Sequence, residues 1–268
     1  MNRISSRLPL CAVLTAFLPA VVQAAVSSIS VTGWTQDIVI NGAGPYNTSV
    51  TSTMDGGIGS IENNTWVEAG NYLDENGAPA SFLGLTAGTK TSLTGNGTFT
   101  FQDFTGNNAL LLTSGLSSTL VLDSPNSFAT LALYGCTGSG PTTATITLTF
   151  SDSSTSNYLV ASGTGIGTDW FNESADKALE VGARASNKSE EGYTRLFYQE
   201  NAVIGINETF LTLTPADQAK TLTSVQITNT LQGTMAVFAI SGELIPEVST
   251  STLIAAFGVL GLVRRKRV

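Results

Sequence analysis

Histidine is absent from the 268 residues of this chain, so the acidic side chains are its main candidates for acid–base catalysis and metal binding. That absence removes the commonest general base and the commonest zinc ligand, which excludes Ser-His-Asp and Cys-His hydrolases and histidine-based zinc sites. Asp152 and Asp169 could supply oxygens to calcium, an ion that takes roughly six to eight oxygen ligands. Neither has the dense Asp and Asn spacing of a calcium loop, so turn formation is the alternative role.

Two carboxylates would be enough for a glycosidase, which needs one acid and one base or nucleophile. Glu190 and Glu191 are adjacent, so in a strand they would face opposite sides and could not share a substrate. Asp169 and Glu208 form a pair that only the fold can test. No acid lies in a stretch typical of a catalytic motif. We therefore expect no enzymatic activity, and a secreted glycosidase or lyase is the least favoured alternative.

Aromatic side chains could complete a ligand site. Trp34, Trp66 and Trp170 could each offer a flat face to a sugar ring, and Trp170 directly follows Asp169. Aromatic residues of β-sandwiches lie in the core more often than on a binding surface, so burial is the favoured alternative. Cys136 lies beside an apolar stretch between glycines and is predicted to be a small buried hydrophobic residue.

The C-terminus has three consecutive parts. A polar turn is followed by an apolar segment and a basic end. The eleven residues 253–263 would form a helix of roughly 16 Å, against about 30 Å for a bilayer core, so the segment is a marginal span. The basic end should remain cytoplasmic, which places the preceding domain outside. A buried C-terminal helix is the alternative. The turn comprises Pro246, Glu247, Val248 and Ser249; the apolar side chains are Leu253, Ile254, Phe257, Val259, Leu260, Leu262 and Val263; the basic stop is Arg264, Arg265, Lys266 and Arg267.

The N-terminus has the pattern of a secretory signal. Arg3 and Arg7 precede an apolar stretch over residues 8–22, and small residues follow it. We expect export by the Sec machinery and cleavage by signal peptidase between Ala24 and Ala25. The predicted organisation is a signal peptide over 1–24, one domain over 25–244 and a C-terminal signal over 245–268.

These two ends together resemble those of bacterial proteins that carry a PEP-CTERM sorting signal. Pro246 and Glu247 match the first two positions of that motif and Ser249 matches its polar continuation, while Val248 stands where a second proline is usual. The resemblance implies that an exosortase, a membrane transpeptidase, recognises the tag. It also implies transient anchoring in the inner membrane, followed by location at the cell surface or outside the cell.

The charge of the mature segment excludes one class of partner. Between residues 25 and 247 the sequence holds 6 Lys and Arg against 20 Asp and Glu, a formal charge of −14. Such a surface repels nucleic acid, so we expect no nucleic-acid binding. Cys136 is the one cysteine of this segment, so no intrachain disulfide is available to it. Stability must come from an apolar core.

The pattern along the mature segment predicts an all-β fold. Apolar residues alternate with polar ones in short stretches, and turn residues recur every eight to twelve positions, the spacing of an antiparallel β-sandwich. In residues 144–150 this places Ile146, Leu148 and Phe150 on one face. One helical turn is expected at 215–219, with Thr214 as its N-cap. Further strands are predicted at 98–104, 110–112, 118–122, 128–134, 157–161, 194–198, 210–213, 224–228 and 235–240.

The order of residues 145–152, 168–171, 215–220, 222–229 and 236–242 resembles jelly-roll domains akin to galactose-binding modules. The resemblance implies a jelly-roll-like sandwich. We therefore expect a non-enzymatic exported surface or extracellular-matrix protein that exosortase sorts. The alternative is a carbohydrate-binding module that contacts extracellular polysaccharide or a biofilm. No cofactor is expected apart from the calcium alternative.

Overall fold

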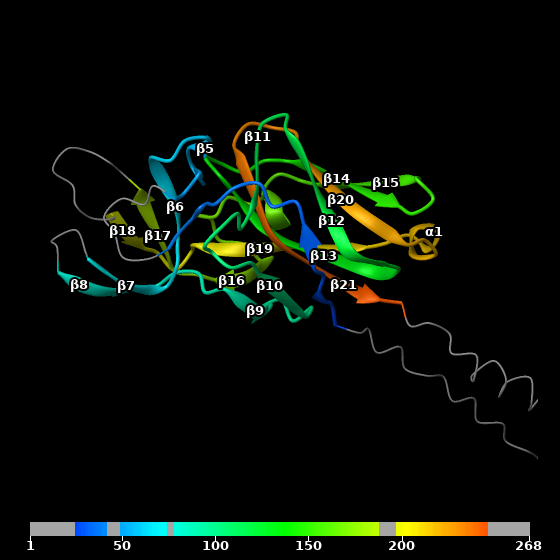
Figure 1. The fold of residues 1–268 in the computed structure, drawn as a ribbon, viewed down its shortest axis with the longest axis horizontal. Helices are drawn as coiled ribbons and strands as arrows, with labels where there is room; N and C mark the ends of the chain where they lie inside the picture. Colours follow the sequence, from blue (N-terminus) through cyan, green and yellow to red (C-terminus); the bar gives the residue numbers. More distant parts are fainter. Residues whose placement is uncertain (1–24, 42–48, 74–77, 188–196, 246–268) are drawn as a thin grey trace, which may run out of the picture.

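The described part of the chain is mostly antiparallel β-structure with almost no helix, as the sequence predicts (Figure 1). The computed structural model describes residues 25–41, 49–73, 78–187 and 197–245. The predicted signal helix and C-terminal helix lie outside these residues. Among the paired strands of the described ranges, β3 (Val39–Ile40) and β6 (Asn63–Val67) alone run parallel.

Two sheets pack face to face. The sheet that we call the inner sheet has the order β1-β21-β13-β19-β16, with β11 also paired to β21; its strands are β1 (Ser27–Ser28), β11 (Leu110–Thr113), β13 (Phe128–Gly138), β16 (Lys177–Glu180), β19 (Gly205–Thr212) and β21 (Thr234–Leu244). The outer sheet has the order β15-β14-β20-β12-β2; its strands are β2 (Val31–Thr32), β12 (Ser117–Asn126), β14 (Ala144–Phe150), β15 (Thr155–Val160) and β20 (Leu222–Asn229).

Eight of these strands pair as a nested series. The first, β11, pairs with the last, β21; the second, β12, pairs with β20; β13 pairs with β19, and β14 pairs with its neighbour β15. Each pair is antiparallel, and successive pairs lie alternately in the inner and outer sheets. The eight strands therefore form one long antiparallel ribbon that is folded over on itself.

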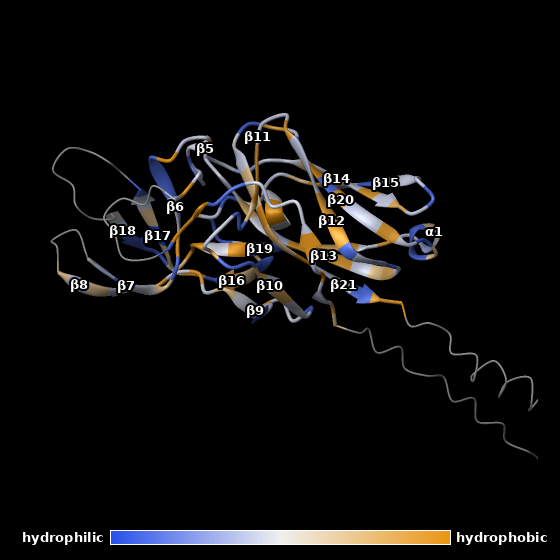
Figure 2. Cartoon of the chain, viewed as in Figure 1, coloured by the Kyte–Doolittle hydropathy of each residue, from blue (hydrophilic) through white to orange (hydrophobic). Residues whose placement is uncertain are grey.

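The outer sheet shows the predicted alternation because only one of its faces is covered. In β14 every second residue is buried, and Ile146, Leu148 and Phe150 face the core between the sheets, so this prediction is confirmed. The opposite face carries partly exposed threonines such as Thr147. In Figure 2 the strands at the centre of the sandwich carry hydrophobic segments, whereas the α-helix at its rim is hydrophilic.

The inner sheet is buried on both faces, which hides its periodicity in the sequence. All but one residue of β13 and the first nine of β21 are buried. Leu131 and Leu133 face the outer sheet, while Ala132 and Tyr134 face a second core. Phe128 shares a face with Leu131 because the register shifts between Phe128 and Thr130, a β-bulge that inserts one residue.

The second core lies between the inner sheet and a group of shorter strands. It contains Trp66, Phe99, Trp170 and Phe238. The hairpin of β9 and β10 covers part of it, and the strands that we call the side lobe cover the rest and enclose a small third core. The hairpin strands are β9 (Gly88–Thr91) and β10 (Thr98–Phe101). The side lobe consists of β3, β4 (Ser52–Thr53), β5 (Gly57–Ile58), β6, β7 (Gly70–Leu73), β8 (Pro79–Phe82), β17 (Ala183–Asn187) and β18 (Phe197–Glu200).

The predicted helical turn is present. The helix α1 spans Pro215–Gln218, and the Thr214 side chain accepts a hydrogen bond from the Asp217 backbone N–H at 3.2 Å. Asp217 also accepts hydrogen bonds from Ser156 Oγ and Tyr158 Oη, at 2.6 and 2.9 Å, which fasten α1 to β15. A short 3-10 helix, η1 (Gly165–Gly167), packs against β13 and β19.

Both ends of the described domain lie at the same pole (Figure 1). Ser27 and Ser28 in β1 pair with Gly242 and Ser241 in β21. The backbone N–H of Ile245 donates to Ser127 O at 3.1 Å, so the fold continues to that residue. The chain therefore enters and leaves the domain side by side.

Candidate functional site

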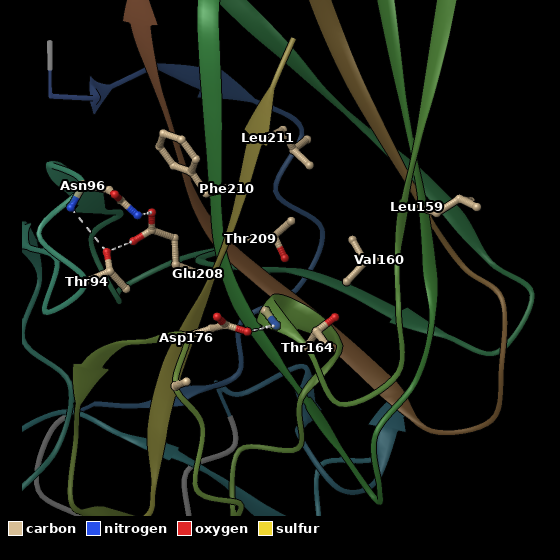
Figure 3. A pocket seen from close by; sticks show the side chains of 12 residues that line it. Thr94, Asn96, Leu159, Val160, Thr164, Asp176, Glu208, Thr209, Phe210 and Leu211 are labelled. Atoms are coloured by element: carbon tan, nitrogen blue, oxygen red, sulfur yellow. Dashed lines mark hydrogen bonds between the residues drawn. The ribbon is translucent and has the colours of Figure 1, made fainter. Parts of the chain in front are cut away.

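A cavity of about 430 Å³ lies at the flank of the sandwich, where β19 of the inner sheet faces β15 of the outer sheet. We call it the Glu208 cavity (Figure 3). Its walls come from four parts of the chain: β19, the end of β15, the start of η1 with the segment before β16, and the turn between β9 and β10. The lining residues are Thr94, Asn96, Leu159, Val160, Thr164, Gly165, Ala175, Asp176, Glu208, Thr209, Phe210 and Leu211.

Glu208 is a buried carboxylate surrounded by neutral donors. Its Oε2 accepts hydrogen bonds from Ser92 Oγ and Thr94 Oγ1, both at 2.6 Å, and its Oε1 accepts one from Asn96 Nδ2 at 2.8 Å. Figure 3 shows Thr94 and Asn96 pointing at it from the β9–β10 turn. A buried charge needs such partners to be tolerated. Glu208 therefore holds this turn against the inner sheet.

The opposite wall is held by backbone contacts. The Gly165 N–H donates to Asp176 Oδ2 at 2.8 Å, and the Ile166 N–H donates to Thr209 Oγ1 at 2.9 Å. Gly165 has a φ of +48°, and a Cβ there would lie 2.1 Å from Thr209 Oγ1, so this position requires glycine. These hydrogen bonds fix the directions of the polar groups on this wall.

One rim of the cavity is apolar. Leu159 in β15 is 81% exposed, although its strand neighbour Val160 is buried. On the β19 side the partly buried Phe210 packs against the second core and Leu211 against the core between the sheets. An exposed leucine beside a polar hollow provides apolar surface for a ligand to cover.

Both carboxylates of the cavity already accept hydrogen bonds from the protein. A glycosidase needs one carboxyl that gives a proton and one that attacks or activates water. Both Glu208 oxygens already accept hydrogen bonds, and Asp176 Oδ2 fixes the η1 backbone. The cavity instead combines acceptor oxygens with an apolar rim.

A second hollow of about 380 Å³ contains an ion pair, and we call it the Arg184 pocket. Arg184 Nη1 lies 3.4 Å from Asp55 Oδ2, and the guanidinium lies over the ring of Phe171 at 4.4 Å from its centroid. Asp169 also lines this pocket, with Oδ2 accepting from the Gly140 N–H at 2.7 Å and Oδ1 from the Phe171 N–H at 2.9 Å. Trp170 completes the wall.

The structure separates the acids that the sequence singled out. Asp169 lines the Arg184 pocket and Glu208 lines the other cavity, so this pair shares neither hollow. Asp152 lies in the turn after β14, where it accepts from the Ser154 N–H at 3.0 Å; its hydrogen bonds to Ser154 lower its pKa. Gly140, which binds Asp169, precedes the opposite end of β14. Within the described ranges no three Cys, Asp or Glu side chains gather as metal ligands. Glu190 and Glu191 lie outside those ranges.

The aromatic candidates lie mainly in the core. Trp66 is fully buried and Trp170 is 1% exposed, and their rings pack edge to face with centroids 4.8 Å apart. Trp34 is half-buried against the core between the sheets. Cys136 is buried, as predicted, and burial raises the pKa of its thiol, with Asp169 and Asp55 adding to the effect. A thiol held in this state is a poor nucleophile.

Neither end signal can be placed in the structure. Ala24 and every residue from Pro246 to Val268 lie outside the described residues, and Ala25 is the first described. Across the described part of the chain, no helix has the length and apolar character needed to cross a bilayer. No family model matches the chain, and a search of curated proteins returns no match.

Sequence reasoning found Asp169 and Trp170 but missed the residues around them. Asp55 lies in the turn between β4 and β5 and Arg184 lies in β17, and the sequence predicted none of these three strands. Glu208 was considered only as a partner of Asp169. One signal could have singled it out: it is an acid inside the strand-like run 204–213, where a charge needs a partner. Its donors Thr94 and Asn96 carry no such signal, because Thr and Asn are abundant throughout the chain.

Proposed function

We propose that this protein is a non-enzymatic exported surface or extracellular-matrix protein, sorted and processed by an exosortase through its C-terminal tag. The observation that carries the proposal is the pairing of β1 with β21, which brings residue 25 and Ile245 to one pole. A domain with both ends at one pole can be held there by either end signal. Its cavities and its remaining surface then stay accessible.

The nested strand pairing supports the jelly-roll-like part of this proposal. In a jelly roll, a long antiparallel ribbon folds into two sheets of four strands. The orders β11-β21-β13-β19 and β12-β20-β14-β15 follow this scheme. The strands β16, β17 and β18 then form an insertion between the fifth and sixth strands of the roll.

The test is processing in the native host. Replacing Pro246 and Glu247 by Ala should leave removal of residues 1–24 intact and prevent cleavage at the C-terminal tag. Intact-mass analysis of the exported protein reads both ends at once. The matched control replaces Ser251 and Thr252 by Ala, between the motif and the apolar segment, and should be processed normally. Unchanged maturation of the Pro246 and Glu247 variant would contradict the proposal.

Carbohydrate binding is the second candidate function, and the Glu208 cavity favours it. An open hollow with carboxylate and hydroxyl groups on its floor and an exposed leucine on its rim matches the two sides of a sugar ring, polar edge and apolar face. Retention of the exported protein on insoluble polysaccharides, measured by pull-down, tests this function. No retention on any polysaccharide would count against it.

A further inference from the structure

The strand β19 has an open edge at the Glu208 cavity. It pairs with β13 from Asn207 to Thr212, but on its other side β16 reaches only Gly205 to Asn207. Beyond Asn207 no described strand continues the sheet. A strand edge of this kind presents unpaired N–H and C=O groups.

The direction of these groups follows from the register. The Leu213 N–H donates to Ala129 O, so odd-numbered residues of this stretch exchange hydrogen bonds with β13. The even-numbered residues point their backbone groups the other way, and the Glu208 N–H accordingly donates to Asp176 O at 2.8 Å. The N–H and C=O of Phe210 therefore face the cavity side, where they offer a donor and an acceptor in fixed positions.

The charge of the lining narrows the class of ligand. The cavity contains two carboxylates, those of Asp176 and Glu208, and no lysine or arginine among its lining residues. An anionic ligand placed there would be repelled by these two carboxylates, since no cation lies within the lining to compensate its charge. Sugar hydroxyls, in contrast, can donate to the carboxylate oxygens.

We propose that the Glu208 cavity binds a neutral sugar ring and discriminates against acidic sugars; this rests on the second function proposed above. Asp176 and the Phe210 backbone bind the hydroxyl edge, and the end of β15, with Val160 and the exposed Leu159 at the rim, supplies the apolar contact. The volume of about 430 Å³ lies within the roughly 300–1,000 Å³ of small-molecule pockets.

A compact ring fits the cavity better than an added peptide strand. Strand addition needs a run of free backbone groups along the edge. Here the Glu208 N–H is already bound to Asp176, and η1 packs against β19 at the same place. The unpaired edge of β19 is therefore blocked at the Glu208 end, which leaves too short a run for a peptide strand to pair with.

The experiment uses the exported, processed protein and saturation-transfer NMR with galactose, glucose, N-acetylglucosamine and galacturonate as probes. We expect transfer to at least one neutral sugar, and at least about tenfold weaker binding of galacturonate. The variant Asp176→Asn keeps an oxygen for the Gly165 N–H but loses one acceptor, so it should weaken binding of the neutral sugar by about tenfold or more. Its matched control is Asp152→Asn, in the turn at the far end of β15, and should bind as the unmodified protein does.

A second variant keeps the test decisive if Asp176→Asn does not fold. Leu159→Asp alters a side chain that is 81% exposed, so the fold should persist while sugar binding falls. Val121→Asp, at a residue 49% exposed in β12, is its control. The proposal is overturned if no neutral sugar binds, if galacturonate binds equally well, or if each variant matches its control. Intact mass of the same samples reports sorting separately, so failure of sugar binding and failure of processing remain distinguishable.

Discussion

The Arg184 pocket and the Glu208 cavity are similar in size and both contain two carboxylates, but they neutralise them differently. In the Arg184 pocket, Asp55 faces a guanidinium that also lies over an aromatic ring. Asp169 is occupied by two backbone N–H groups. In the Glu208 cavity no cation is present among the lining residues, and neutral hydroxyl and amide donors surround Glu208.

This difference is the reason why we propose the Glu208 cavity, and not the Arg184 pocket, as the ligand site. In the Arg184 pocket the ion pair occupies Asp55 and two backbone N–H groups occupy Asp169, so a ligand would have to replace contacts that already exist. The Glu208 cavity lies at an unfinished sheet edge, where backbone groups still face outward. An ion pair thus occupies polar groups of one hollow, whereas an open strand edge leaves backbone groups of the other unpaired.

The largest effect is expected from removing Glu208. The change Glu208→Ala leaves Ser92, Thr94 and Asn96 without their shared acceptor in a position that is 4% exposed. The free energy of unfolding should fall by about 3 kcal/mol, measured by urea denaturation. Glu208→Gln retains one acceptor oxygen and should lose about 1 kcal/mol. A loss below about 0.5 kcal/mol for Glu208→Ala would remove the contrast between the two hollows.

A buried acid outside both hollows, Asp37, tests how many neutral hydrogen-bond donors a buried carboxylate needs. Burial raises the pKa of Asp37 to about 6, although hydrogen bonds from Asn108 and the Val39 N–H act in the opposite direction. The folded state then binds a proton that the unfolded state has lost, so stability decreases as the pH rises from about 4 through 6.

Asp37→Asn removes this ionisation and should raise the free energy of unfolding at pH 8 by about 1–2 kcal/mol, after allowance for solvent screening. At pH 4 the variant and the unmodified protein should differ little. Thermal unfolding from pH 4 to pH 8 measures both expectations. If the free energy of unfolding of the variant did not rise at pH 8, the two donors from Asn108 and Val39 would be sufficient to stabilise the buried Asp37 carboxylate.

The smallest effect concerns the ion pair. Arg184→Met keeps an apolar side chain against Phe171 but removes the charge opposite Asp55, and the free energy of unfolding should fall by about 1 kcal/mol. The loss should shrink in 1 M NaCl because salt screens the attraction between charges. Lys177→Met, whose partner Glu173 is 76% exposed, is the control and should change stability by less than about 0.5 kcal/mol. A loss in Arg184→Met that salt leaves unchanged would point to packing instead of charge.

The sequence indicated the fold most clearly in strands that have one buried face and one solvent-exposed face. The alternation around Ile146 and Leu148 in β14 was correctly recognised, as was the Thr214 cap of α1. In β13 and β21 both faces are buried, so periodicity was weak and the strand ends were underestimated. Strands β1 to β5 have two residues each, too few to show a period, and in the side lobe β18 alone overlaps a predicted strand, 194–198.

The site was less predictable than the fold. Its lining runs from Thr94 to Leu211, and these residues meet only because β19 pairs with β13 and because the β9–β10 turn folds onto Glu208. Neither contact has a local signature in the sequence. Asp169 could be identified beside Trp170, but the cation that its pocket contains, Arg184, lies in the unpredicted β17.

The position of β21 has a consequence for the order in which the domain assembles. It is the last strand of the domain, yet it lies between β13 on one side and β1 and β11 on the other. Ser27 and its partner Gly242 are adjacent in space but lie near opposite ends of the domain's sequence. Pairing between such distant segments makes folding slow, because a long loop must close before any contact compensates for it. The centre of the inner sheet therefore stays incomplete until this last strand has been synthesised, and β1 and β11 have no partner in the sheet before then.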